Sequence, residues 1–234
     1  MEANSANVES SFSVLRRVGI VLILVGVLDI AWMFHVISSG HAYSSSFNIF
    51  AVIAGVLLYR QSLRTARLVT VFAAFFLSAL AGLLLVFPLI VPLALIRTYV
   101  RITPVPSLIG WSALIIGVTI MLWWVYRSLT SLAVQGAIQS AGLSDKRFRY
   151  HPKAGFWSGA FLTALLVIVF TFTNRSETAQ EAVKRARAEK GSDYRYFVSG
   201  LSTSWSGDTG THVQATVLAY TDSSIETVSL EWRE

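Results

Sequence analysis

One carboxylate, Asp29, lies near the middle of the apolar run 18–37. Acidic side chains in hydrocarbon are costly, and they commonly mark functional positions. Ser78, Thr119 and Thr163 lie near the midpoints of later apolar runs, so they share the depth of Asp29. A protonated Asp29 would hydrogen bond one of these hydroxyls as a structural contact, whereas an ionised Asp29 would be a proton or cation site. The sequence leaves both interpretations open.

Three arginines between two apolar runs form a second candidate group. Arg60, Arg64 and Arg67 have the spacing i, i+4 and i+7, which places them on one face of a helix. Such a face near the inner leaflet can hold anionic lipid headgroups. The simpler interpretation is a turn between two spans whose charges set the topology.

Patterns for catalysis or metal binding are not found. Cysteine is absent, which excludes disulfides, thiolate ligands and thiol nucleophiles. His35 and His41 are six residues apart, a spacing that puts them on roughly opposite faces of a helix rather than at one metal. The sequence has no P-loop, dinucleotide-binding glycine motif, HExxH or GxSxG. We therefore predict no catalytic residues, no metal and no cofactor.

The composition indicates a membrane protein. Of the 234 residues, 54% are hydrophobic and only 14% are charged, and the mean hydropathy is +0.59; soluble domains carry about 25% charged residues. Residues 1–173 hold 12 Lys and Arg against 4 Asp and Glu, whereas residues 174–234 hold 7 against 9. The basic excess lies in short loops between apolar runs, where it sets topology, so we expect the lipid bilayer and no nucleic acid as a partner.

Five apolar runs are candidates for membrane spans. The run 43–59 is the weakest, because it is short and begins with three serines. The longest run is divided by Pro88 and Pro92, so we expect a helix to about Phe87 and then a kinked or interfacial piece that ends near Arg97. The predicted spans are 18–37, 43–59, 68–87, 108–126 and 154–173.

The distribution of cations predicts the orientation. With a cytoplasmic N-terminus, ten Lys and Arg residues fall on the inner side, and only Arg97 and Arg101 fall in outer loops. This matches the positive-inside rule for five spans, and omitting the run 43–59 breaks the match. We therefore expect a multi-pass bacterial inner-membrane protein with its C-terminus in the periplasm.

Residues 174–234 predict a small extracytoplasmic α+β domain. Ser176 is a candidate N-cap and Gly191 a helix stop. Between them, small residues recur on one helical face: Ala179, Ala182, Val183 and Ala186. Three alternating runs follow, Tyr194–Trp205 with a bulge at Gly200, Thr211–Thr221, and a third that contains Val228, Leu230 and Trp232. The predicted fold class is an α-helical integral membrane protein with one helix on a three-stranded antiparallel sheet.

Two stretches resemble known families. The segments YSSSFNIFAVIAGVLLYRQSLRTARLV and FPLIVPLAL resemble a poorly characterised group of proteobacterial multi-pass inner-membrane proteins over about residues 18–130. The tail, EAVKRARA followed by YFVSGLSTSWSGDTG, is similar to the helix-plus-sheet domain of Coa1-type cytochrome oxidase assembly factors, in which the domain also follows a membrane helix. The second resemblance implies a role in assembly.

Two functions are compatible with the sequence. The first is a non-enzymatic inner-membrane protein that contacts an envelope or membrane protein through residues 176–234, as an assembly factor, accessory subunit or immunity-type inhibitor. The alternative is a small transporter or ion-coupled protein that works through Asp29.

Overall fold

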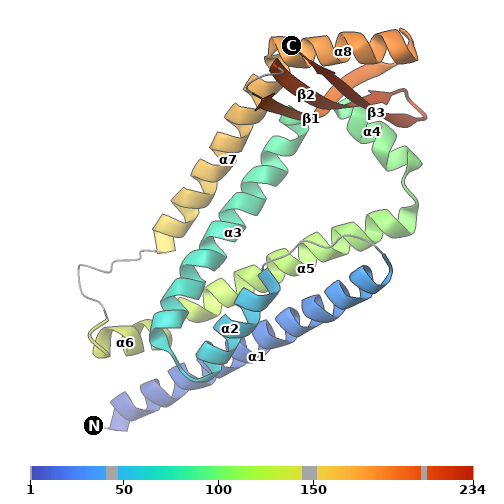
Figure 1. Cartoon of the computed structure of the whole chain (residues 1–234). Coiled ribbons are helices and arrows are strands. Elements are labelled where there is room, and N and C mark those ends of the chain that lie inside the picture. Colours follow the sequence, from blue (N-terminus) through green and yellow to red (C-terminus); the bar gives the residue numbers. More distant parts are fainter. Residues whose placement is uncertain (1, 41–46, 144–151, 207–209, 234) are drawn as a thin grey trace. The chain divides into compact units, whose positions relative to one another are not determined.

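The computed structural model of the chain describes residues 2–40, 47–143, 152–206 and 210–233. Within these ranges it contains eight helices and one sheet of three strands (Figure 1). The helices are α1 (Glu2–Ser38), α2 (Phe47–Tyr59), α3 (Leu63–Ile90), α4 (Leu93–Ile102), α5 (Val105–Leu129), α6 (Leu132–Ser140), α7 (Pro152–Arg175) and α8 (Glu177–Lys190). The strands are β1 (Arg195–Ser206), β2 (Gly210–Tyr220) and β3 (Ile225–Arg233).

Four helices are long and apolar enough to cross a membrane. They are Ser11–Ser38 of α1, Leu63–Ile90 of α3, Val105–Leu129 of α5 and Lys153–Arg175 of α7. The prediction of long apolar helices is confirmed at these four positions. The predicted run 43–59 corresponds to α2, which has 13 described residues; a helix of that length is about 20 Å long, shorter than the roughly 30 Å hydrocarbon core. Residues 43–46 lie outside the described ranges.

Helix boundaries differ from the predictions where helices extend beyond their apolar runs. α1 begins at Glu2, because polar residues continue a helix as well as apolar ones do. The predicted end near Phe87 is wrong, since α3 includes Pro88 and ends at Ile90. The break falls at Val91, directly before Pro92, where the α conformation is disfavoured. α6 was not predicted.

The described residues form two compact units: residues 1–79 with 117–160, and residues 80–116 with 161–234. The second unit therefore includes α4 and parts of α3, α5 and α7 beside the sheet, whereas the sequence suggested a boundary at 173/174. In the first unit, α2 runs antiparallel to α1, and Gly55 lies so close to Gly19 that a Cβ on either would be within 3 Å of the other's carbonyl oxygen. The core of this unit comes from α1, α2, α3, α5 and α6, with the buried residues Leu15, Val18, Leu22, Ala54, Leu58, Ala66, Val69, Ala73, Val125, Leu129 and Val134.

The turn between α2 and α3 is defined by its backbone hydrogen bonds. Gln61 has a φ of 63°, in the left-handed region. The N–H of Ser62 donates to the carbonyl oxygen of Leu57, and the N–H of Gln61 donates to that of Leu58. These two bonds form a Schellman motif, which ends α2. The Ser62 hydroxyl then accepts a hydrogen bond of 3.3 Å from the N–H of Thr65 and begins α3.

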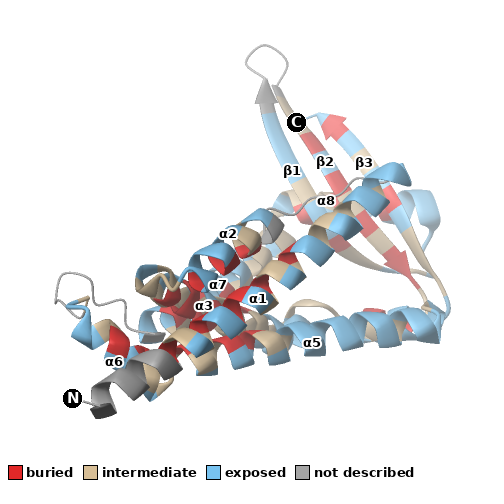
Figure 2. Cartoon of the chain, turned by 90° about the horizontal axis from the view of Figure 1, so that it is seen from below, coloured by how far each residue is buried: buried red, intermediate tan, exposed pale blue. Residues whose placement is uncertain are grey.

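The C-terminal part of the second unit is an antiparallel meander with strand order β1-β2-β3 and α8 on one face (Figure 1). The predicted helix, its N-cap Ser176 and its stop at Gly191 are confirmed. The bulge predicted at Gly200 is confirmed too, because the register shifts between Val198 and Gly200. Buried residues follow β2 (Figure 2). The link between β1 and β2, residues 207–209, lies outside the described residues.

Candidate functional site

Asp29 lies on the protein-facing side of α1. Leu15, Leu22 and Gly26 are buried along this side, and Asp29 continues it three residues beyond Gly26 with a half-buried side chain. This placement agrees with the tendency of intramembrane carboxylates to face protein rather than lipid. Thr119, one of its predicted partners, is half-buried on α5.

The other two predicted hydroxyls lie where α3 meets α7. Ser78 donates a hydrogen bond of 2.8 Å to the carbonyl oxygen of Phe156. Thr163 is buried and faces Gly82, where a Cβ would lie 2.5 Å from the threonine Oγ1. The structure therefore brings each of these hydroxyls into a helix–helix contact, and a hydrogen bond from one of them to Asp29 stays a prediction.

Two glycines let α7 approach α3 closely within the first unit. A Cβ on Gly155 would collide with the carbonyl oxygen of Val71, and a Cβ on Gly159 with that of Phe75. Glycines four residues apart form the GxxxG pattern of close helix crossings in membranes. Hydropathy-based reasoning missed this contact, although the segment GFWSG at 155–159 carries its signal.

Arg60, Arg64 and Arg67 do not share one helix. Arg60 lies in the turn after α2, whereas Arg64 is exposed and Arg67 half-buried on α3. The Arg67 guanidinium donates a hydrogen bond to the carbonyl oxygen of Leu143. The spacing argument for one continuous basic helical face is thus wrong, because the turn interrupts the helix. Lipid contact by the exposed Arg60 and Arg64 stays a prediction.

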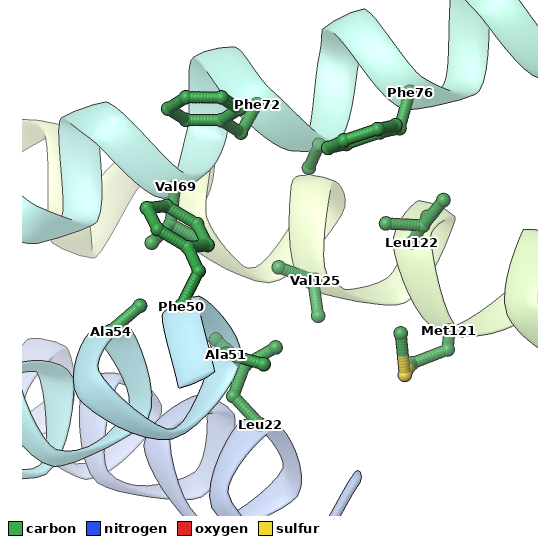
Figure 3. A pocket seen from close by; sticks show the side chains of 11 residues that line it. Leu22, Phe50, Ala51, Ala54, Val69, Phe72, Phe76, Met121, Leu122 and Val125 are labelled. Carbon is green, nitrogen blue, oxygen red and sulfur yellow. The ribbon is translucent and has the colours of Figure 1, made fainter. Parts of the chain in front are cut away.

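A small gap in the first unit is lined only by apolar side chains (Figure 3). Its volume is about 30 Å³, comparable to one water molecule, and no polar group in its lining could hold that water. The gap is therefore imperfect packing rather than a ligand site. Its lining is Leu22, Phe50, Ala51, Ala54, Val69, Phe72, Ala73, Phe76, Met121, Leu122 and Val125.

One face of the sheet is closed by α8. Ala179, Ala182 and Ala186 are buried against it, as the sequence predicted. Two basic residues of α8 also lie over aromatic rings of the sheet: the Arg185 guanidinium is 4.9 Å from the ring centroid of Trp232, and that of Arg187 is 5.8 Å from Tyr196. The buried side chains of α8 are only alanines, and the two cation–π contacts add to the attraction between this helix and the sheet.

A polar cluster joins the C-terminal end of α8 to the start of β3. The ammonium group of Lys190 is 2.7 Å from the Glu226 carboxylate, which also accepts a hydrogen bond of 3.1 Å from the Tyr194 hydroxyl. The hydrogen bond from Lys190, then that from Tyr194, lowers the pKa of Glu226. The same carboxylate raises the pKa of Lys190 and of Tyr194, chiefly through these hydrogen bonds. Lys190 is exposed, and Tyr194 and Glu226 are partly buried, so the cluster joins α8 to β3 at the domain surface, where solvent screens the ion pair.

The face of the sheet opposite α8 is exposed in the half that contains Ser202, Gln214 and Glu231. Side chains alternate along each strand, so residues between the buried ones point away from α8. A hollow of about 420 Å³ lies here, and its surface is mixed polar and apolar. Its lining is Gly200, Leu201, Ser202, Gln214, Ala215, Thr216, Ser229, Leu230 and Glu231. Gln214 donates a hydrogen bond of 2.9 Å to Glu231 across the strands. This face presents hydroxyl and amide groups and the Glu231 carboxylate.

The turn between β2 and β3 rests on α4. Thr98 of α4 is buried, and its hydroxyl donates a hydrogen bond of 2.7 Å to the carbonyl oxygen of Thr221. At the same end of the sheet, the ring centroids of Phe170 in α7 and Phe197 in β1 are 5.9 Å apart. The sheet is therefore attached to α4 and to the C-terminal part of α7.

In the ranges that the structure describes, no three His, Asp or Glu side chains gather closely enough to hold a metal ion. His41 and His151 fall outside these ranges. The chain matches no protein-family model, no curated protein and no solved structure. The two family resemblances of the sequence therefore stay predictions.

Proposed function

We propose that the chain is a multi-pass bacterial inner-membrane protein with a cytoplasmic N-terminus and a periplasmic C-terminus. Four helices of sufficient length and hydropathy support insertion. The excess of Lys and Arg in the loops assigned to the inner side supports the orientation.

The hairpin of α1 and α2 supports the same orientation. The Arg16 guanidinium lies 5.9 Å from the ring centroid of Tyr59, so the end of α2 returns to the basic end of the apolar part of α1. α3 therefore begins on the same side of the membrane as Arg16, whether or not α2 crosses the whole bilayer. Reporter fusions after Arg64 and Gly191 are expected to report the cytoplasm and the periplasm, respectively, and any other pair of outcomes contradicts this topology.

We propose further that the protein acts without catalysis, by contacting another envelope component through residues 176–234. The open polar face of the sheet carries this proposal. α8 covers one face of the sheet, whereas the hollow of about 420 Å³ on the other face has the exposed polar side chains of Ser202, Gln214, Ser229 and Glu231, which are suited to the hydrogen bonds of a protein interface. An assembly factor, an accessory subunit and an immunity-type inhibitor all act through such contacts.

Mild-detergent purification of the intact chain tests the proposal. A stoichiometric envelope protein is expected to co-purify, and Ser202→Arg with Ser229→Arg on the open face is expected to remove it. The control is Gln180→Arg with Ala188→Arg on the exposed side of α8, which adds the same charge and is expected to keep the partner. Absence of any stoichiometric partner, or its retention in the open-face variant, contradicts the proposal.

The alternative is a transporter or ion-coupled protein that works through Asp29. The half-buried position of Asp29 on the protein-facing side of α1 favours it. In a strain whose growth depends on the protein, partner binding predicts that Asp29→Asn is tolerated and that deletion of 176–234 is not. The reverse result favours transport.

A further inference from the structure

α4 connects two long apolar helices by short links. Val91 and Pro92 separate it from α3, and Thr103 and Pro104 separate it from α5. Both links break the helix, because a residue before proline avoids the α conformation. Since α3 and α5 are each long enough to cross a bilayer, α4 lies where the chain leaves one span and enters the next.

The two opposite sides of α4 have different environments. Leu95 and Thr98 are buried, and Thr98 bonds to the turn between β2 and β3. On the other side, Leu93 and Val100 are 58% and 51% exposed. A helix of this kind, with bare aliphatic side chains on one side and a folded domain on the other, is suited to the boundary between headgroups and acyl chains.

Two cations flank the exposed aliphatic side. Arg97 and Arg101 are both exposed, one turn apart, and α4 has no acidic residue. Like charges at i and i+4 destabilise a helix. The ion pairs found among the described residues all lie within residues 181–226, and none of them includes Arg97 or Arg101. The positions also oppose the positive-inside rule, because these are the two cations of the predicted outer loops. An anionic partner outside the chain would offset both penalties.

We propose that α4 is an interfacial helix whose Arg97 and Arg101 bind the phosphate groups of anionic phospholipids, and that it thereby seats the sheet on the membrane surface. The inference rests on the membrane placement proposed above. Because α4 lies directly between two helices that are long enough to cross a bilayer, its arginines would be close to lipid headgroups, and this favours lipid over a soluble anion as the ligand. Arg97 and Arg101 supply the charge, Leu93 and Val100 enter the acyl boundary, and Thr98 transmits the position of the helix to the sheet.

Lipid selectivity at α4 tests this proposal. Because the chain has no cysteine, Tyr99→Cys provides a unique site for a fluorophore. The labelled full chain is reconstituted in vesicles, and quenching by brominated phosphatidylglycerol is compared with quenching by brominated phosphatidylcholine. We expect the relative binding constant to favour phosphatidylglycerol by at least about 5-fold, the usual contribution of one surface cation. Arg97→Gln with Arg101→Gln is expected to reduce this ratio to about 1.

The matched control removes two exposed arginines elsewhere, Arg127→Gln with Arg233→Gln, and is expected to keep the ratio. Excess inorganic phosphate distinguishes a site for free phosphate, which it would occupy, from a site for lipid, which is expected to keep its selectivity. A ratio near 1 in the unchanged chain, or an unchanged ratio in the Arg97 and Arg101 variant, overturns the proposal. Flotation of the protein with the vesicles is measured in the same samples, so a ratio near 1 in the unchanged chain with flotation intact refutes the role of α4 and leaves the membrane placement standing.

Discussion

The contact between α8 and the sheet and the contact between α3 and α7 are both built from small residues, for different physical reasons. In the contact between α8 and the sheet, three alanines of α8 pack against valines and Trp232 of the sheet. Burial of this apolar surface from water stabilises the contact. In the second, Gly155 and Gly159 bring backbones together, and Ser78 bonds to a carbonyl oxygen. In the membrane placement proposed above, lipid offers no hydrophobic driving force for helix association, so close packing and hydrogen bonds would have to stabilise it.

This difference predicts which kind of substitution destabilises each region. We expect the domain of α8 and the sheet to lose stability when buried volume is removed, and the apolar helices to lose stability when volume is added at a glycine. The following predictions test the comparison, beginning with the largest effect.

Trp232→Ala is expected to unfold the domain of α8 and the sheet. The change removes a side chain that is 7% exposed and the ring that Arg185 covers. Truncation of a buried Trp costs about 3–5 kcal/mol, and a core of about 60 residues without a disulfide supplies little more. Limited proteolysis in mild detergent is expected to cut the variant between α8 and β1. Trp157→Ala, at a side chain that is 75% exposed on α7, is expected to stay resistant, and equal cleavage of the two variants contradicts the comparison.

Gly159→Ala is expected to weaken the contact of α7 with α3. The new Cβ meets the carbonyl oxygen of Phe75, which a backbone shift must relieve, and overpacking of this kind costs about 1–3 kcal/mol. A lower thermal midpoint in detergent would show the loss. Gly117→Ala on α5, where nothing lies within 4 Å, is expected to be neutral or slightly stabilising. If the two alanines have the same effect, close approach at Gly159 does not stabilise the helices.

Ser176→Ala is expected to loosen the first turn of α8 by about 1 kcal/mol. The Ser176 hydroxyl accepts a hydrogen bond of 3.2 Å from the N–H of Ala179 and donates one of 2.7 Å to the carbonyl oxygen of Thr173. Amide exchange at Ala179 is expected to become about 5-fold faster. Ser176→Asp keeps the cap and is expected to restore slow exchange, whereas slow exchange in the alanine variant excludes the capping role.

The smallest expected effect is a pH dependence at Lys190 and Glu226. The folded-state pKa of Glu226 is lowered, so its contribution is present above the ordinary carboxyl pKa of about 4.3 and is lost as pH falls through the lowered value. The pKa of Lys190 is raised, so its contribution is lost only as pH rises through the raised value. Glu226→Gln is expected to flatten the acid side of the stability profile, as measured by the thermal midpoint of the domain at pH 7 and pH 4. Asp193→Asn changes charge equally and is expected to leave the profile unchanged; a flat profile in the original chain contradicts the prediction.

The two regions also differ in how well the sequence predicts them. Residues 176–233 follow helical and strand periods closely, because one face of each element meets water and the other does not. The cap at Ser176, the alanine face of α8 and the bulge beside Gly200 were all predictable for this reason.

Periodicity predicts less about the packing of the apolar helices. In a membrane, a helix side that faces lipid and a side that faces protein are both apolar, so the sequence does not distinguish them. Hydropathy located the long helices, but it gave no contact between them and placed the end of α3 three residues early. α6 is a nine-residue helix with no strong pattern, and it was missed. The spacing of Arg60, Arg64 and Arg67 suggested one helical face because the turn at Gln61 uses a left-handed residue other than glycine, which the sequence does not reveal.

The meander has a consequence for the order of folding. Each strand pairs with the next strand along the chain, and α8 directly precedes β1, so nearly all contacts of this core join residues close in sequence. Chains rich in local contacts fold fast. The hydrogen bond between Thr98 and Thr221 is an exception that joins residues 123 positions apart. We therefore expect the sheet to form as soon as its own segment is free to fold, and its attachment to α4 to be a late step in the maturation of the protein.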